Sequence, residues 1–216
     1  MVFDLVSYLL GKYDAFNQDT SQSSRFLIGI TGPPAAGKST ISAWLSQALG
    51  ERIAAPCTVV PMDGFHLDNE VLEERGLRHL KGVPATFDAQ GFVALIKRIK
   101  LQRDEHIFFP LFDRSNECVV PDAACLRAGT RLVIVEGNYL LNEEEPWHQL
   151  RYHLDEIVYI DCDADLLHKR LIDRHMAGGM SASEAAQKVS CTDTPNAELI
   201  RRTKNLASKQ IIIETA

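Results

Sequence analysis

Runs of apolar residues alternate with amphipathic segments along most of this chain. Continuous apolar runs are typical of strands buried on both faces, and they occur at residues 26–30, 58–62, 107–109, 131–136, 156–160 and 210–213. Apolar positions at helical spacing predict helices between them, at about residues 41–48, 88–99, 164–175, 183–189 and 197–205. This alternation predicts an α/β fold whose mostly parallel sheet carries helices on both faces.

The pattern also divides the chain into parts. Apolar residues at helical spacing near the N-terminus predict a helix over residues 1–16 that packs on the domain, followed by a polar linker at 17–24. A membrane-surface helix is the alternative, although such helices usually carry more Lys and Arg on their polar face. We expect residues 25–216 to form a single domain with a small helical lid at about residues 170–195.

Composition narrows the function without defining it. The 216 residues are 45% hydrophobic and 24% charged, which is ordinary for a globular protein. The net charge of −6 argues against broad nucleic-acid binding, which needs a basic face. Five scattered cysteines form no C-x-x-C pair and suit a reducing cytoplasm. No run of 18 apolar residues occurs, so we expect no membrane span.

The most specific motif follows the first predicted strand. Residues 32–40 fit G-x-x-x-x-G-K-[ST], the loop between a strand and a helix that cradles nucleotide phosphates. Lys38 would reach the β- and γ-phosphates, and the Ser39 hydroxyl would hold Mg²⁺. The alternative is a simple Gly/Pro turn before a helix. The expected nucleotide-binding residues are Gly32, Ala35, Ala36, Gly37, Lys38, Ser39 and Thr40.

Two carboxylates stand at the ends of predicted strands. Asp63 could position an acceptor hydroxyl and take its proton, although Asp-Gly is also a common turn. Glu136 could organise Mg²⁺, directly or through water, or be a surface carboxylate at a strand end. The carboxyl ends of parallel strands share one edge of a sheet, where ligands bind in folds of this class.

Several cations and aromatic residues are further candidates. Arg170 and Arg174 are four residues apart on one predicted helix and could neutralise a transferring phosphoryl group, or form a solvated basic face. Lys81 and Arg114 lie in loops and could bind an anionic or polyhydroxylated substrate, or be surface residues. Residues that could line an acceptor pocket, and that also suit routine core or loop positions, are His66, Phe87, Phe112, Asn138 and Tyr139.

Three longer motifs carry a family resemblance. They are M-D-G-F-H from Met62, K-G-V-P-A-T-F-D from Lys81 and E-G-N-Y-L-L from Glu136. With the phosphate loop they resemble the P-loop kinases of the phosphoribulokinase/uridine kinase family, over about residues 25–213. The resemblance implies a P-loop NTPase fold, ATP and Mg²⁺ as cofactors, Asp63 as base, and lid arginines. It further implies that Asn196, in a T-P-N-A turn, lies near the adenine.

The acceptor motifs depart from each known branch. Uridine kinases usually follow the aspartate with Ser-Phe-Tyr, whereas this chain has Gly-Phe-His from Gly64. Pantothenate kinases are longer and carry a Tyr-Ser-His-type segment where this chain has P-L-F-D-R from Pro110. The latter stretch looks closest to a bacterial subgroup named fructose transport system kinases. The resemblance therefore ranks a sugar first, a nucleoside second and pantothenate third, and family analogy suggests a homodimer.

The resulting hypothesis is a cytoplasmic, Mg²⁺-ATP-dependent kinase that phosphorylates a hydroxyl of a small metabolite, with no nucleic-acid or membrane partner. A GTPase-type switch is one rival, but no N-K-x-D-like guanine signature follows the later strands. The other rival is a nucleotide-binding regulator that has lost turnover. The presence of Lys38, Ser39, Asp63 and Glu136 together argues against that reading.

Overall fold

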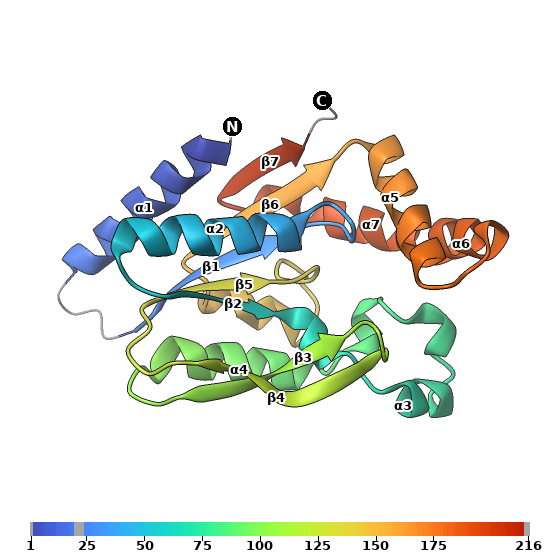
Figure 1. Ribbon diagram of the computed structural model, residues 1–216, viewed down its shortest axis with the longest axis horizontal. Coiled ribbons are helices and arrows are strands. Elements are labelled where there is room, and N and C mark those ends of the chain that lie inside the picture. The colour runs from blue at the N-terminus through green and yellow to red at the C-terminus, as the bar shows by residue number, and fades with distance from the viewer. Residues whose placement is uncertain (1, 20–23, 214–216) are drawn as a thin grey trace.

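The centre of the protein is a five-stranded parallel sheet, as seen in a computed structural model that describes residues 2–19 and 24–213 (Figure 1). Every neighbouring pair of its strands is parallel. The predicted α/β fold is therefore confirmed, with the strand order β2 (Cys57–Pro61), β5 (Leu132–Glu136), β1 (Phe26–Thr31), β6 (Glu156–Cys162) and β7 (Lys209–Ile213).

Helices cover both faces of this sheet (Figure 1). On one face lie α1 (Val2–Gln18) and α2 (Lys38–Ile53), and on the other lie α4 (Ala89–Leu101) and the 3-10 helix Trp147–Tyr152. The three central strands, β5, β1 and β6, are buried from both sides, which is why they are continuous apolar runs in the sequence. Of the helices in the described ranges, none is both long enough and apolar enough to cross a membrane.

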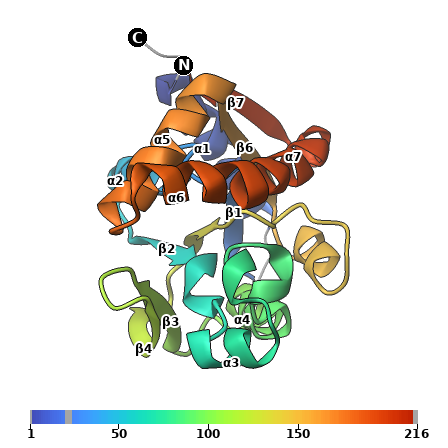
Figure 2. The same ribbon diagram turned by 90° about the vertical axis from the view of Figure 1, so that its right-hand side faces the viewer.

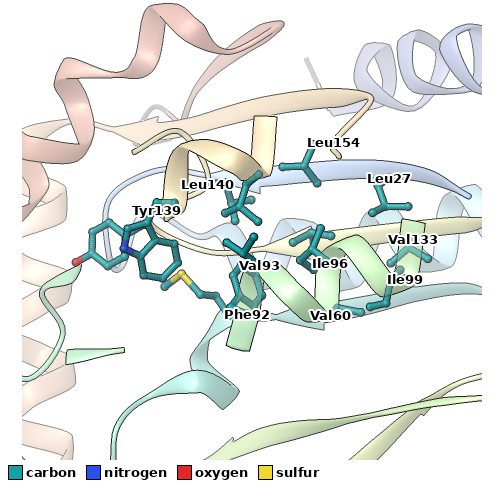
Figure 3. Close-up of a cluster of buried hydrophobic side chains, with 14 of the residues drawn as sticks. Leu27, Val60, Phe92, Val93, Ile96, Ile99, Val133, Tyr139, Leu140 and Leu154 are labelled. Carbon is teal, nitrogen blue, oxygen red and sulfur yellow. The ribbon is translucent and has the colours of Figure 1, made fainter. Parts of the chain in front are cut away.

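The α4 face holds the larger apolar cluster (Figure 3). Phe92, Ile96 and Ile99 of α4 are fully buried against the sheet, at the spacing that predicted the helix. Burying one such side chain stabilises a fold by about 1.5–3 kcal/mol. The helix begins where predicted, because the Asp88 carboxylate accepts a hydrogen bond from the Gly91 N–H at 2.9 Å.

The N-terminal helix α1 packs on the opposite face, as predicted. Leu5 and Leu9 are fully buried in the cluster that α2 and the sheet form. Glu156 at the start of β6 ties the helix down, accepting from the Tyr8 hydroxyl and the Lys12 ammonium, both at 2.8 Å. Of the expected linker, residues 20–23 lie outside the described residues, as do Met1 and residues 214–216 at the chain ends.

A β-hairpin departs from the prediction. The apolar run at 107–109 extends to β3 (Ile107–Asp113), which pairs with β4 (Cys118–Leu126) in a separate antiparallel sheet. The β4 strand was not predicted, because most of its side chains are exposed and polar and apolar positions are mixed. The hairpin lies against the turn Met62–Phe65, where a Cβ on Gly64 would come within 2.2 Å of the Pro110 carbonyl oxygen. Only glycine permits this approach.

Two segments stand above the sheet edge on opposite sides (Figure 2). One, which we name the cap segment, is residues 66–87; it contains α3 (Asn69–Glu74) and is closed at its ends by an antiparallel bridge between His66 and Phe87. The other, the lid helices, follows β6. It comprises α5 (Ala164–Ala177), α6 (Ala182–Lys188) and the π-helix Val189–Asp193, and it leads into α7 (Thr194–Arg202).

The predicted T-P-N-A turn forms the first turn of α7 in the structure. The helix begins at Thr194 and carries Pro195 in its first turn. Proline suits this position because its missing N–H would have no intrahelical partner there. The start predicted at residue 197 was therefore three residues late.

Candidate active site

The carboxyl ends of the central strands meet beneath the cap segment and the lid helices. Pairing in register brings the ends of β1, β2 and β5 together, with Ile30 and Pro61 both opposite Glu136. A cavity of about 1730 Å³ opens at this edge. The predicted site residues that line it are Ala35, Gly37, Lys38, Ser39, Thr40, Asp63, His66, Lys81, Phe87, Phe112, Arg114, Glu136, Asn138, Arg170, Arg174 and Asn196.

Three predicted residues lie behind the cavity wall. Gly32, Ala36 and Tyr139 are buried, and the cavity lining does not include them. A Cβ on Gly32, whose φ is +143°, would lie 1.9 Å from the Ile160 carbonyl oxygen, so this glycine lets the loop pass close to β6. The expected roles of Gly32 and Ala36 in nucleotide binding and of Tyr139 in acceptor binding stay predictions.

The phosphate loop has the backbone geometry of an anion cradle. Ala35 and Gly37 have positive φ values of 62° and 98°, which turn the loop sharply ahead of α2. For Ala35 the left-handed conformation costs about 1–2 kcal/mol, a strain typical of functional loops. The N-cap, Gly37, offers no side chain to the first N–H groups of α2, so these donors and the helix dipole are available to an anion.

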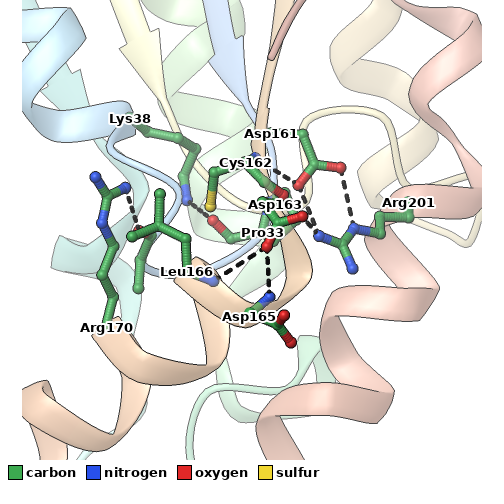
Figure 4. A network of polar contacts seen from close by, with 10 residues as sticks. Pro33, Lys38, Asp161, Cys162, Asp163, Asp165, Leu166, Arg170 and Arg201 are labelled. Carbon is green, nitrogen blue, oxygen red and sulfur yellow. Dashed lines mark hydrogen bonds and ion pairs between the residues drawn. The ribbon is translucent and has the colours of Figure 1, made fainter. Parts of the chain in front are cut away.

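Lys38 crosses the loop from the first turn of α2 (Figure 4). Its side chain is buried, and its Nζ donates to the Pro33 carbonyl at 2.8 Å. Burial lowers the pKa of this ammonium, while the nearby carboxylates of Glu136 and Asp63 act in the opposite direction. A buried cation held over a loop of N–H donors suits a phosphate chain.

Ser39 and Glu136 form an oxygen pair at the same edge. The Ser39 hydroxyl donates to Glu136 Oε2 at 3.1 Å. Burial raises the pKa of the Glu136 carboxyl, and the positive charge of Lys38 opposes this shift. A hydroxyl beside a carboxylate is a donor set that fits Mg²⁺. Within residues 2–19 and 24–213, no group of three or more His, Cys, Asp or Glu is placed to hold a metal ion.

Asp63 faces this pair from the neighbouring strand end. It lies in the turn that follows β2, and its Oδ2 accepts from Arg114 Nη2 at 2.5 Å. Arg114 comes from the hairpin turn, which the Asp113 side chain folds by accepting from the Ser115 N–H at 2.8 Å. The predicted base and the predicted substrate cation are therefore paired across 51 residues of sequence.

The two predicted lid arginines both reach the cavity from α5. Arg170 Nη1 approaches the Ala35 carbonyl at 3.5 Å, so this arginine lies against the phosphate loop (Figure 4). Arg174 lines the cavity and is solvent-accessible there. Desolvation by the surrounding protein lowers the pKa of its guanidinium, and the positive charge of Arg114 lowers it further. Beside it, His175 Nε2 is paired with Asp193 Oδ2 at 2.6 Å, which joins α5 to the π-helix.

An aromatic wall lines the cavity next to Asp63. The His66 ring stacks on Phe87 with centroids 4.0 Å apart and lies 4.9 Å from Phe112. Burial lowers the pKa of His66 to about 4, so its ring is neutral at pH 7. Lys81 Nζ lies 5.0 Å from the centroid of the Phe112 ring, in the range of a cation–π contact.

Asn196 is buried between the cap segment and the lid helices. Its Oδ1 accepts from the Tyr139 hydroxyl at 2.7 Å, and its Nδ2 donates to the Gly82 carbonyl at 3.2 Å. The Tyr139 hydroxyl has a single proton, which the Gly82 carbonyl oxygen shares with Asn196 Oδ1, and burial raises the pKa of this hydroxyl. The polar atoms of both predicted residues are thus engaged with the cap segment, and the expected contact of Asn196 with adenine stays a prediction.

Sequence reasoning missed several lining residues. Lys188 and His175 from the lid helices, and Arg78 and Glu117 on the opposite wall, belong to the cavity. They lie in no motif, and ordinary helix and loop patterns surround them. Asp161, by contrast, stands at a strand end as Asp63 and Glu136 do, but it is bound by Arg201 outside the cavity (Figure 4).

This fold and phosphate loop define a P-loop kinase, and comparison with known proteins identifies the family. Residues 27–213 match the phosphoribulokinase / uridine kinase family, so the chain belongs to it. The chain is accordingly an ATP-dependent small-molecule kinase, as the sequence predicted. The resemblance noted from the motifs is confirmed.

Individual relatives carry different substrate names. A Schizosaccharomyces pombe protein named "Putative uridine kinase C227.14" is 32% identical over 197 residues, covering 88% of this chain and 83% of that one. A Streptococcus pneumoniae pantothenate kinase is 31% identical, covering 74% of this chain and 53% of its own. A solved structure from Silicibacter, named "putative fructose transport system kinase", is 35% identical with a TM-score of 0.86, covering 98% of both chains.

Proposed function

We propose that this kinase transfers the γ-phosphoryl group of ATP to a hydroxyl of a sugar or sugar-like polyol. The observation that carries the proposal is the position of Asp63, paired with Arg114 and facing the cavity that Lys38, Ser39 and Glu136 also line. The sugar-type acceptor draws support from the Silicibacter structure, whose name refers to fructose transport.

The chain's own residues have distinct roles in this mechanism. Asp63 accepts the proton of the acceptor hydroxyl as its oxygen bonds to the γ-phosphorus and the bond to the bridging oxygen of ADP breaks. Arg114 holds the Asp63 carboxylate in place at 2.5 Å. Lys38 and the N–H groups of the phosphate loop bind the phosphates. Ser39 and Glu136 would hold Mg²⁺, which supplies charge neutralisation between the β- and γ-phosphates.

The lid helices would complete the site from above. Arg170 lies against the phosphate loop and Arg174 within the cavity, so both guanidinium groups are near the path of the transferring group. A cation there stabilises charge on the phosphoryl oxygens in the transition state. Movement of the lid helices toward the cap segment would exclude water, which would otherwise compete with the acceptor.

A nucleoside acceptor is the second candidate. It is favoured by the Schizosaccharomyces pombe relative named for uridine and by the flat stack of His66 on Phe87, on which a base could lie. Pantothenate ranks third, on the Streptococcus pneumoniae relative.

The test is ADP release from Mg²⁺-ATP with fructose and other sugars, nucleosides and pantothenate. We expect one acceptor class to raise turnover in the wild type, and Asp63→Asn to lower kcat by about 10²–10⁴-fold because the general base is lost. ATP affinity should change little. The matched control is Asp122→Asn, at an exposed carboxylate of β4 whose φ of 52° asparagine tolerates.

Four outcomes decide between these hypotheses. Turnover with a sugar establishes the first acceptor class, and turnover with uridine or pantothenate replaces it with the second or third. Full activity of Asp63→Asn would remove Asp63 from the role of base. ATP binding without ADP release on any acceptor would favour a regulator without turnover.

A further inference from the structure

Two lysines meet where the cap segment faces the lid helices. Lys81 Nζ donates to Asn69 Oδ1 at 2.7 Å and approaches the Glu117 carbonyl at 3.4 Å. Lys188, at the end of α6, donates to the His79 carbonyl at 2.8 Å and approaches the Lys81 carbonyl at 3.4 Å. Both residues line the cavity, Lys81 from the cap segment and Lys188 from α6. Figure 2 shows the cap segment and α6 facing each other.

The partners of both ammonium groups are uncharged oxygens. An ammonium has three donors, and the contacts above occupy two on each lysine. Among the described residues, neither lysine forms an ion pair. One donor and a full positive charge on each lysine are therefore available to a ligand in the cavity.

The carboxylates nearby are engaged elsewhere. Glu117 pairs with Arg78 at 3.0 Å, and Asp193 pairs with His175 at 2.6 Å. Glu184 accepts from the Ser181 hydroxyl at 2.6 Å in the capping box of α6. These three carboxylates are thus tied into the walls and, within the part of the chain that the structure describes, form no ion pair with either lysine. The charges of Glu117 and Asp68 still act on Lys81, and that of Asp193 acts on Lys188.

Burial makes this arrangement costly without an anion. Burial lowers the pKa of Lys81 and of Lys188, and the charge of Arg78 acts in the same direction on both. The negative charges of Glu117 at Lys81 and of Asp193 at Lys188 oppose this shift without reversing it. Asn69 and Phe112 hold Lys81 in one place. Positively charged groups kept partly desolvated and fixed at a cavity wall favour a negatively charged ligand group, because its charge offsets their desolvation.

We propose that the acceptor carries an anionic group, a carboxylate or a phosphate, that binds between Lys81 and Lys188. The inference rests on the proposed function and narrows its acceptor to a polyol acid or a polyol phosphate. The hydroxyl to be phosphorylated lies at Asp63, and the anionic group lies toward the junction of the cap segment with α6. Because one lysine belongs to each segment, the bound anion would also reinforce the contact between the lid helices and the cap segment that Lys188 already makes.

The test uses matched acceptors that differ in charge. ADP release is measured with fructose and fructose 6-phosphate, glucose and gluconate, and glycerol and glycerate. We expect kcat/KM for an anionic member to exceed that of its neutral partner by about 10–100-fold, the range for a charge-assisted hydrogen bond. Binding of each compound in the presence of a non-hydrolysable ATP analogue is measured in parallel.

Variants of the two lysines test whether these residues cause the preference for anionic acceptors. Lys188→Met and Lys81→Met should each raise the KM for the anionic acceptor by about 10–100-fold. The KM for ATP should stay within about threefold, which also reports that the variants are folded. The control is Lys169→Met, at an exposed lysine of α5 that pairs with Asp173 at 3.0 Å on the outer side of the same lid.

The outcomes separate this inference from the proposed function. Efficient turnover of a neutral sugar, with no advantage for its acid or phosphate, overturns the anionic acceptor and leaves the sugar kinase intact. Anion-dependent turnover that neither lysine variant alters overturns the site. If no compound is turned over, the parallel binding data decide: selective binding of anions supports the inference, and equal or absent binding rejects it.

Discussion

At the scale of single residues, burial is the largest cause of the pKa shifts of Lys38, His66 and Glu136 in the site. His66 is the clearest case, since its Nδ1 is buried without a hydrogen-bond partner while its ring is stacked on Phe87. The groups that act on it come from four elements: the Asp63 carboxylate, and the cations Lys81, Arg114 and Arg174. Burial dominates, and the uncharged ring forms part of the cavity wall beside Asp63.

This environment predicts a pH-dependent stability. The folded pKa of His66, about 4, lies below its ordinary value of 6.5. The stabilising contribution of neutral His66 to the free energy of unfolding is therefore complete above pH 6.5. It is lost as the pH falls toward 4, because the unfolded chain binds the proton more tightly than the folded protein does. Between these values the wild type should lose up to about 3 kcal/mol of unfolding free energy relative to His66→Phe, which keeps the stack and cannot be protonated.

Urea unfolding at pH 4, 5, 6 and 7 measures this difference. His168→Gln, at an exposed histidine of α5, serves as the control and should follow the wild type. Parallel pH profiles for the wild type and His66→Phe would show that the folded protein does not hold His66 neutral.

At the scale of elements, α1 belongs to the core of the kinase domain. The sequence predicted a helix that packs on the domain, and the fully buried Leu5 and Leu9 join it to the cluster under α2. Its outer face is exposed, and at Gly11 a Cβ would meet no atom within 4 Å. One helix thus offers a buried position and an open one two residues apart.

These positions predict opposite effects of alanine. Leu9→Ala should lower the free energy of unfolding by about 2–5 kcal/mol, through lost burial and the cavity left behind. Gly11→Ala should raise it by about 0.5–1 kcal/mol, because glycine is a poor residue within a helix. Chemical denaturation of the wild type and both variants measures the two changes in the free energy of unfolding. A loss below about 1 kcal/mol for Leu9→Ala would mean that α1 unfolds separately from the domain.

At the scale of the whole molecule, the site is assembled from segments that are distant in sequence. The phosphate loop, the turn after β2, the hairpin and α5 each bring a charged side chain to one cavity. The sheet supplies the rigid edge, and the cap segment and lid helices stand on either side of it (Figure 2). A ligand that binds across these segments stabilises the whole fold.

Nucleotide should accordingly raise the melting temperature. A non-hydrolysable ATP analogue with Mg²⁺ at 100 times its Kd adds about 2.7 kcal/mol of stability. For a domain of this size that corresponds to a rise of about 5–10 °C in Tm. Lys38→Ala should show a much smaller rise at the same concentration, because a buried phosphate contact is lost. An equal rise in the variant would place the nucleotide away from the phosphate loop.

Much of the fold and part of the site could be predicted because they depend on local patterns. Continuous apolar runs predicted all five strands of the parallel sheet, since strands buried on both faces need no alternation. The spacing of Gly32, Gly37, Lys38 and Ser39 predicted the phosphate loop, because that geometry is built within one strand–loop–helix unit. Strand-end positions indicated Asp63 and Glu136 for the same reason.

The sequence alone thus determined the parallel sheet, the helices α1, α2 and α4 that cover it and the nucleotide loop, whereas only the tertiary structure decided what surrounds Asp63 in the cavity. The pairing of Arg114 with Asp63, the engagement of Asn196 with the cap segment and the approach of Lys188 to Lys81 join residues that are 51 to 114 apart. No local periodicity encodes such contacts. They arise from how the hairpin, cap segment and lid helices pack over the sheet, and packing depends on all of these segments at once.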